Sequence, residues 1–159
     1  MKVRVGFGFD VHQLREGRPC ILGGVEITHH KGPYGHSDAD VLIHAICDAL
    51  LGAANLRDIG FHFPDTSDDF KSIDSRLLLK KVTELVRAKG YELGNIDTTL
   101  VLEMPKINPH IDKMITVLSE VMAIDPDDIS IKATTNEKLG FIGREEGVTA
   151  YAVAVITKS

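Results

Sequence analysis

The chain of 159 residues has no tryptophan and only two cysteines, and none of its apolar runs approaches the roughly 20 residues that span a bilayer. Cys20 and Cys47 both stand among apolar residues, which is typical of buried, reduced thiols rather than of a disulfide framework. The first residues, MKVRVGFGFD, form neither the apolar core of a signal peptide nor an Arg- and Ser-rich transit segment. These absences predict a cytoplasmic protein with no membrane partner.

An excess of basic residues is also missing, because the formal net charge is -5 with histidine neutral. A nucleic-acid-binding protein needs a basic face, so the charge argues against nucleic acid as a partner. It still allows a local basic pocket for a small phosphorylated ligand. With 43% hydrophobic and 26% charged residues, and no repeat or linker, the chain is typical of one globular domain over residues 1–159.

The periodicity of apolar residues predicts alternating strands and helices. Residues 3–12 alternate strictly, which predicts a strand with one buried, apolar face formed by Val3, Val5, Phe7, Phe9 and Val11. Segments 29–37 and 55–72 have the composition of loops. We expect an α+β sandwich with one mainly four-stranded mixed sheet and helices on one face. The other expected elements are strands at 20–28, 95–103, 129–135 and 148–157, and helices at 38–54, 75–89 and 111–122.

Asp10 and His12 lie two positions apart on the polar side of the first strand. Residues i and i+2 share a face, and strand rise places them about 7 Å apart at their roots. A carboxylate oxygen and an imidazole nitrogen are ordinary zinc ligands, so the pair could converge on one ion. The alternative is that both are solvated polar residues at a strand end.

Asp40, His44 and Asp48 form a polar stripe at i, i+4 and i+8 on the first helix. A solvated stripe usually carries Lys, Glu and Arg, which this helix interior lacks. The stripe therefore either faces solvent or faces a specific site. Asp10, His12 and His44 together would supply three ligands and leave a fourth zinc position open, as in catalytic sites. Asp48 could then orient the His44 ring.

The segment GHSDAD precedes this helix and places His36 and Ser37 where backbone N–H groups favour an anion. A phosphate could bind there beside the metal. The alternative is an ordinary helix cap provided by Ser37 or Asp38.

The segment KATTNEKLGFIGREEG is the other unusual stretch. Lys132 and Lys138 flank hydroxyl-bearing residues at a strand end, Glu137 could hold Mg²⁺, and Arg144 could grip a phosphate. The alternative is a charged, hairpin-like connection. A rigid loop, MPKINPH, could present its backbone to the edge of a base.

These segments occur in an order that resembles one enzyme family along nearly the whole chain. The resemblance is to the 2-C-methyl-D-erythritol 2,4-cyclodiphosphate synthases of non-mevalonate isoprenoid biosynthesis. The segments that carry it are GFDVH, GGVEI, HSDAD, HAICDALLGAA, DIGFHFPDT, KGYELGNID, MPKINPHI and KATTNEKLGFIGREEG.

The resemblance implies an activity, two cofactors and an assembly. Members of this family convert 4-diphosphocytidyl-2-C-methyl-D-erythritol 2-phosphate to the cyclic diphosphate and release CMP, a phosphorus–oxygen lyase reaction. They use Zn²⁺ and a second ion, Mg²⁺ or Mn²⁺. They are homotrimers with active sites between subunits, and an isoprenoid diphosphate could occupy the central cavity beside Phe141, Arg144 and Glu146.

Carried over residue by residue, the resemblance assigns zinc to Asp10, His12 and His44 and the second ion to Glu137. It assigns stabilisation of the transition state to His36 and Thr135. The substrate positions that it implies are Asp10, His12, His36, Ser37, Asp58, Ile59, Gly60, Phe63, Pro64, Asp65, Thr66, Ser67, Leu102, Pro105, Lys106, Ile107, Asn108, Thr134, Thr135, Asn136, Glu137, Phe141 and Arg144.

The chain departs from the family pattern at a few positions, and these put the shape of the base pocket and the cavity in doubt. The departures are His62, Glu103, Met104, Asn136 and Glu145. Two other functions stay open from the residues alone. One is a zinc-dependent phosphoesterase that uses water; the other is a non-catalytic module that binds nucleotides or prenyl diphosphates around a structural zinc.

Overall fold

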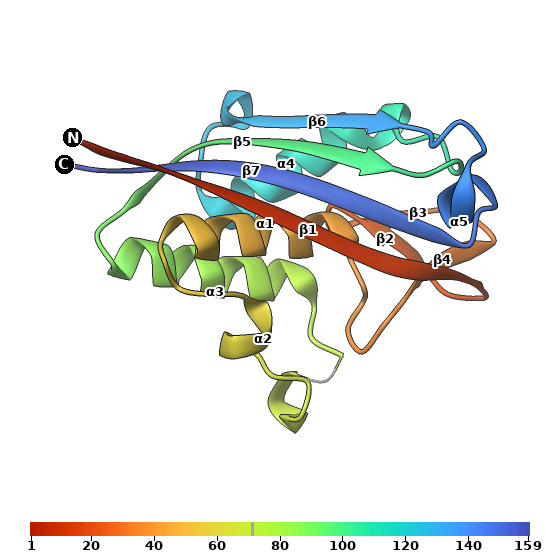
Figure 1. Ribbon diagram of the computed structural model, residues 1–159, viewed down its shortest axis with the longest axis horizontal. Coiled ribbons are helices and arrows are strands. Elements are labelled where there is room, and N and C mark those ends of the chain that lie inside the picture. Colours follow the sequence, from red (N-terminus) through yellow and green to blue (C-terminus); the bar gives the residue numbers. More distant parts are fainter. Residues whose placement is uncertain (71) are drawn as a thin grey trace.

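The computed structural model describes residues 1–70 and 72–159 and is built on a five-stranded mixed sheet in the order β4-β1-β7-β5-β6 (Figure 1). Strands β5 and β6 are parallel, whereas the other neighbours are antiparallel. A separate hairpin pairs β2 with β3. The strands are β1 (Lys2–Glu16), β2 (Cys20–Leu22), β3 (Val25–Ile27), β4 (Lys31–Tyr34), β5 (Glu92–Val101), β6 (Ile129–Thr134) and β7 (Gly147–Lys158).

The longer helices pack on one face of this sheet (Figure 1). This confirms the predicted α+β architecture, although the sheet has five strands where mainly four were expected. Within the described ranges, no helix combines the length and apolar character needed to cross a membrane. The helices are α1 (Val41–Ala53), α2 (Ile59–His62), α3 (Ser75–Ala88), α4 (Ile111–Met122) and α5 (Gly140–Gly143), with 3-10 turns at Asp68–Phe70, Asn108–His110 and Pro126–Asp128.

Helix α1 lies directly over β1 because glycines leave room for it. A Cβ atom built on Gly6 would be 1.8 Å from the Ala49 carbonyl oxygen, and one on Gly8 would be 1.8 Å from that of Ala45. Only glycine permits this approach of helix and strand backbones. The helix therefore covers the side of β1 that carries Gly6, Gly8, Asp10 and His12.

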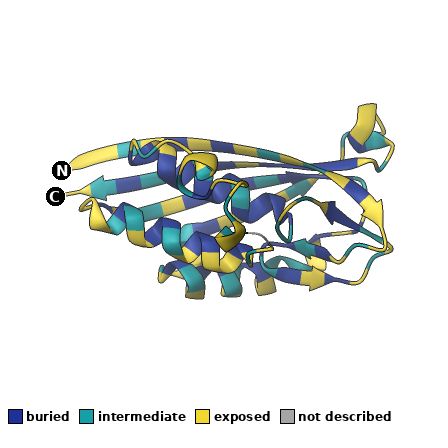
Figure 2. Cartoon of the chain, turned by 90° about the horizontal axis from the view of Figure 1, so that it is seen from below, coloured by how far each residue is buried: buried dark blue, intermediate teal, exposed yellow. Residues whose placement is uncertain are grey.

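The expected orientation of β1 was therefore wrong. Its apolar residues, from Val3 to Val11, are 43–65% exposed, and the covered side is the one with the glycines. Figure 2 shows exposed and buried residues alternating along this strand from the N-terminus. Tyr151 and Val153 of β7 extend this exposed apolar face, and the Tyr151 ring lies 5.2 Å from that of Phe9. Alternation shows that a strand has two different faces, but it does not show which face the helix covers.

Two segments differ locally from expectation. Residues 29–37, interpreted as a loop, contain β4, which extends the sheet at its β1 edge. Residues 20–28 form two strands rather than one, since Gly23 and Gly24 have φ values of 60° and 73° and make the turn between β2 and β3.

Asp40 caps α1, instead of Ser37 or Asp38. Its carboxylate accepts the Ile43 backbone N–H at 3.1 Å and is fully buried. The same carboxylate accepts N–H groups from Gly23 at 2.9 Å and Gly24 at 2.7 Å. One side chain thus joins the start of α1 to the β2–β3 turn.

The cysteines behave as predicted. Cys20 and Cys47 are free and buried in the core between the helices and the sheet. Burial, together with the charge of Asp40, raises the pKa of Cys20 to about 11, and burial raises the pKa of Cys47 well above its usual value. Both thiols therefore stay protonated and unreactive near neutral pH.

Candidate active site

Three side chains converge at the edge of the sheet where β1 passes the start of α1. The Asp10 Oδ2 atom lies 2.9 Å from His12 Nε2 and 3.1 Å from His44 Nδ1. The two ring nitrogens lie 3.4 Å from each other. Among the described residues, this is the one group of three metal-ligating side chains within 4.8 Å.

The packing of α1 on β1 creates this cluster. On the covered side of β1, Gly6 and Gly8 lie beneath the alanines of α1, and side chains resume at Asp10 and His12. His44 projects from the first turn of α1 toward them. The three polar side chains therefore meet just beyond the stretch where the helix and strand backbones are closest.

The charges in the cluster favour one another. Burial opposes ionisation of Asp10, but hydrogen bonds with the His12 and His44 rings outweigh it and hold the pKa of Asp10 below its usual value. Burial alone would lower the pKa of His44, but the hydrogen bond and charge of Asp10, helped by Asp40 and Asp38, raise it. The cluster thus presents an ionised carboxylate beside two imidazole nitrogens, and a positive charge placed between them would be stabilised.

Each ring has a partner on its far side. The His12 Nδ1 atom lies 3.0 Å from the Tyr34 carbonyl oxygen, which can only accept, so this nitrogen is the donor and Nε2 is left with a lone pair. His44 Nε2 lies 3.0 Å from the Ser75 hydroxyl. The lone pair of His12 Nε2 is therefore directed at the same space as Asp10 Oδ2.

Asp48 does not orient His44, contrary to expectation. Its carboxylate accepts the Ile59 backbone N–H at 2.9 Å and so holds the start of α2 against α1. The partner of the His44 ring is Ser75, at the start of α3, which sequence reasoning missed. The two residues are 31 positions apart in the chain, and no local pattern connects them.

The donor set fits a divalent metal ion. Two imidazole nitrogens and a carboxylate oxygen suit zinc, and three protein ligands leave a position for a substrate oxygen. A structural zinc site would normally have four protein ligands, often cysteines. Both cysteines lie in the core, away from this cluster.

A cleft of about 450 Å³ opens over the cluster. It includes some of the residues expected at the substrate, and the rest of segment 58–67 lies beside it. Asp58 caps α2 by accepting the Phe61 N–H at 2.9 Å. The expected residues that line the cleft are Asp10, His12, His36, Ser37, His44, Ile59, Gly60, Phe63 and Asp65, whereas Asp58, Pro64, Thr66 and Ser67 are not among its lining.

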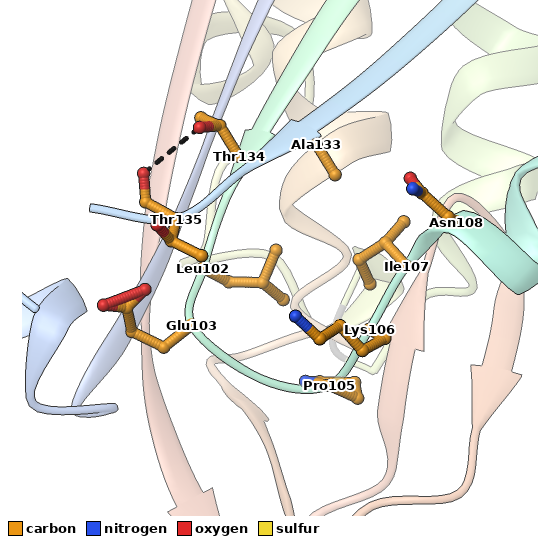
Figure 3. A pocket seen from close by; sticks show the side chains of 9 residues that line it. All are labelled: Leu102, Glu103, Pro105, Lys106, Ile107, Asn108, Ala133, Thr134 and Thr135. Atoms are coloured by element: carbon orange, nitrogen blue, oxygen red, sulfur yellow. Dashed lines mark hydrogen bonds between the residues drawn. The ribbon is translucent and has the colours of Figure 1, made fainter. Parts of the chain in front are cut away.

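A second, smaller pocket of about 120 Å³ lies where β5 and β6 end side by side (Figure 3). Its walls come from the loop after β5 and from the last residues of β6, as the resemblance implied for a nucleotide. None of its described lining residues also lines the cleft. The lining residues are Leu102, Glu103, Pro105, Lys106, Ile107, Asn108, Ala133, Thr134 and Thr135.

Glu103 fixes the turn that follows β6. Its carboxylate accepts the backbone N–H of Asn136 at 3.2 Å and that of Lys138 at 2.6 Å. Glu137 and Lys138 both have positive φ, at 53° and 61°, a conformation that costs energy for residues other than glycine. The departure at Glu103 therefore has a physical role, since it holds a strained turn.

The rest of that turn is also internally bonded. The Thr135 hydroxyl accepts the Glu137 N–H at 3.2 Å, and the Asn136 side-chain amide donates to the Leu139 carbonyl at 2.8 Å. Glu137 itself is exposed and lines a neighbouring pocket with Glu103, Lys106 and Thr135. Its carboxylate is therefore accessible to a ligand that occupies that pocket.

Phe141 and Arg144 line neither of these two pockets. Phe141 lines a groove with Val11, His12 and Glu146, and the Arg144 Nε atom is 3.0 Å from Glu146 Oε1. Both side chains are exposed in the single chain.

Comparisons with known proteins agree on one family. The pattern of the YgbB family matches residues 3–157. A protein of Cytophaga hutchinsonii named 2-C-methyl-D-erythritol 2,4-cyclodiphosphate synthase is 67% identical over 158 residues, which cover 99% of each chain.

Solved structures show the same likeness. The bifunctional IspDF protein of Campylobacter jejuni is 42% identical with a TM-score of 0.95, and the match covers 99% of this chain and 43% of that one. A 2C-methyl-D-erythritol-2,4-cyclodiphosphate synthase in a CDP-bound form is 38% identical with a TM-score of 0.90, covering 97% of this chain and 100% of the other.

Proposed function

The chain belongs to the YgbB family, and we propose that it converts 4-diphosphocytidyl-2-C-methyl-D-erythritol 2-phosphate to 2-C-methyl-D-erythritol 2,4-cyclodiphosphate and releases CMP. The observation that carries this proposal is the cluster of Asp10, His12 and His44 inside an open cleft. A relative of 67% identity bears the name of this synthase. A phosphorus–oxygen lyase is the corresponding enzyme class.

The reaction joins two phosphates of one substrate. An oxygen of the 2-phosphate attacks the β-phosphorus of the CDP group and forms the new P–O bond. The bond between the β-phosphorus and the bridging oxygen breaks, and CMP leaves with that oxygen and the electron pair. Because the second pKa of a phosphate monoester is about 6, the attacking group is already ionised and needs no side-chain base. The task of the protein is to orient the groups and stabilise charge.

Asp10, His12 and His44 would hold a zinc ion at the cleft. The bound ion would supply Lewis-acid polarisation of the phosphate under attack. His36 and Ser37, in the loop before α1, line the same cleft and would bind phosphate oxygens through side-chain and backbone donors. Ile59, Gly60, Phe63 and Asp65 would form the wall that excludes water from the methylerythritol part, which favours cyclisation over hydrolysis.

The smaller pocket would hold the cytidine diphosphate. Pro105 and Ile107, which line this pocket, would offer apolar walls to the base, and Lys106 would supply a positive charge near the phosphates. Thr135, held in its turn, would donate its hydroxyl to a phosphate in the transition state. Glu137 would bind Mg²⁺ or Mn²⁺, which supplies neutralising charge on the diphosphate.

A homotrimer with active sites between subunits accounts for two features of the single chain. The sheet exposes a row of large apolar side chains, including Phe7 at 63% exposure, and such faces normally mark interfaces. The metal cleft and the nucleotide pocket have separate linings, so a substrate that needs both could bridge neighbouring chains. The groove at Phe141, next to Arg144 and Glu146, would then lie near the centre, where an isoprenoid diphosphate could bind.

The test is phosphorus NMR of the purified protein with the CDP-linked substrate and Mg²⁺, with and without a zinc chelator. We expect a cyclic diphosphate and CMP, both lost on chelation. Inorganic phosphate would instead identify a zinc phosphoesterase. An unchanged substrate that still binds would identify a non-catalytic binding module.

The matched variants are His44→Ala and His30→Ala. His44→Ala should abolish turnover and leave the fold largely intact, because it removes a ligand without opening the core beneath α1. His30 is exposed outside the cleft, so His30→Ala should retain wild-type turnover. Near-normal activity of His44→Ala would refute the metal assignment.

A further inference from the structure

The ring of His44 is held from behind by a chain of two side chains. Its Nε2 atom lies 3.0 Å from the Ser75 hydroxyl, and that hydroxyl donates a hydrogen bond to Asp38 Oδ1. The Ser75 backbone N–H donates to the other oxygen of Asp38 at 2.9 Å. Ser37 Oγ lies farther from Nε2, at 3.4 Å, and already accepts the Ala39 N–H.

The direction of these hydrogen bonds follows from counting protons. An ionised carboxylate can only accept, so Asp38 takes the single proton of the Ser75 hydroxyl. The Ser75 oxygen then has only lone pairs to offer to His44. Its neighbour, Nε2, must therefore be the protonated nitrogen of a neutral His44 ring, and Nδ1 must carry the lone pair. Nδ1 is the atom that faces Asp10 Oδ2 and His12 Nε2.

We propose that Asp38 and Ser75 are positioning residues for His44, which fix its Nε2 proton and direct its Nδ1 lone pair into the metal site. This rests on the proposed function, because it assumes that the cluster holds zinc. It replaces the role expected of Asp48, which is committed to the backbone of Ile59. Such outer partners set the tautomer and orientation of a ligating histidine and commonly change metal affinity by about 10–100-fold.

The location of Ser75 suits this role. It is the first residue of α3, and its side chain is fully buried, so water does not compete for the His44 proton. Asp74, not Ser75, caps the helix by accepting the Arg76 N–H at 2.9 Å. Removing the Ser75 hydroxyl therefore leaves the helix cap in place.

The experiment compares zinc affinity in the full chain with Ser75→Ala, Asp38→Asn and a control. Zinc is titrated against a chromophoric chelator, and the melting temperature of each metal-free protein is recorded. Thr83→Val is the matched control, since it removes another buried hydroxyl from α3, one that donates to the Leu79 carbonyl of its own helix at 2.9 Å. We expect Ser75→Ala to bind zinc about 10–100-fold more weakly and Thr83→Val to match the wild type.

A spectroscopic measurement separates orientation from a general structural effect. In zinc-loaded protein labelled with ¹⁵N-histidine, long-range proton–nitrogen NMR should show a slowly exchanging proton on His44 Nε2. This proton should persist in Thr83→Val and become exchange-broadened in Ser75→Ala. If Ser75→Ala does not fold, Asp38→Asn takes its place and should change zinc affinity and this proton in the same direction.

Wild-type zinc affinity together with an unchanged Nε2 proton in the folded variants would overturn the positioning role. A wild-type chain that binds no zinc would overturn the metal site and the positioning role together. A wild-type chain that binds zinc but does not turn over the substrate would overturn the proposed reaction, and a weaker affinity in Ser75→Ala would still support the role of Ser75.

Discussion

Asp40 shows how one buried carboxylate can connect three segments. It accepts N–H groups from Ile43, Gly23 and Gly24, and it lies inside the core with no exposed surface. Burial raises its pKa to about 6, and the nearby charge of Asp38 adds to this, whereas the three N–H groups act in the opposite direction. The folded chain therefore binds a proton at Asp40 more tightly than the unfolded chain does.

This predicts a pH dependence of stability. Between about pH 4 and pH 6 the folded state keeps a proton that the unfolded state has released, so this group lowers the free energy of unfolding as pH rises. The shift corresponds to a loss of up to about 3 kcal/mol across that window. Asp40→Asn lacks this titration and carries a constant cost from its mismatched amide.

The measurement is chemical denaturation of the wild type and Asp40→Asn at several values between pH 4 and pH 7. The stability of the wild type relative to the variant should fall as pH rises and level off above pH 6. Two parallel curves would show that the pKa of Asp40 is not raised.

At the residue scale, the sequence predicted the candidate metal ligands better than the side chains that hydrogen-bond to the site and hold it in place. Asp10, His12 and His44 carry recognisable spacing on one strand and one helix. Ser75 and Glu103 do not, because their partners are distant in the chain and the contacts appear only after the helices pack. Helical spacing predicted that Asp48 would support His44, but its carboxylate instead accepts the Ile59 N–H at the start of α2.

At the scale of elements, the pairing of β1 with α1 is the feature on which the site depends. Gly6 and Gly8 let the helix backbone approach the strand, and the ligands follow on the same face. The helical periods predicted α3 as 75–89 and the structure has Ser75–Ala88, since amphipathic helices carry a strong pattern. Strand β4 was not predicted, because it is only four residues long and contains a glycine and a proline, which are typical of loops.

A pair of glycine substitutions tests this packing. Gly8→Ala should destabilise the chain by about 1–3 kcal/mol or more, because its Cβ would meet the Ala45 carbonyl. Gly52 is the control, since it lies within α1 and a Cβ there would meet, among the described residues, no atom within 4 Å beyond its own turn of the helix. Gly52→Ala should stabilise by about 0.5–1 kcal/mol through a lower entropy of the unfolded chain. Thermal unfolding measures both, and equal effects of the two changes would refute the close approach.

The turn after β6 is a second element whose geometry depends on one side chain. Glu103→Ala removes the acceptor of two backbone N–H groups, and hydrogen bonds to a charged group contribute about 1.5–3 kcal/mol each. We expect faster hydrogen exchange at Asn136 and Lys138 and on the order of tenfold weaker CDP binding, measured by calorimetry. Exposed Glu84→Ala is the control and should change neither. Unchanged exchange at both amides in Glu103→Ala would show that the turn is stable without the Glu103 carboxylate.

At the scale of the whole molecule, the chain has one well-covered face of its sheet and one uncovered face. The helices bury the first, and no described segment covers the second, which carries Val5, Phe7, Phe9, Tyr151 and Val153. Leaving such side chains in water costs roughly 25 cal/mol per Å² of apolar surface, so association through this face would be favourable. Strand alternation had placed Val5, Phe7 and Phe9 in the core, and in the proposed trimer this face would be buried between chains.

Phe7→Glu tests this assembly. A charge in the middle of the apolar face should dissociate the proposed trimer, because an unpaired carboxylate would be buried at its interface. Sedimentation velocity should then show the mass of one chain instead of three, with turnover lost if sites form between subunits. Leu77→Glu is the control, since Leu77 is 48% exposed on α3, in the helical layer away from the sheet face. If Phe7→Glu sediments like the wild type and Leu77→Glu, the exposed face of the sheet is not where the chains meet.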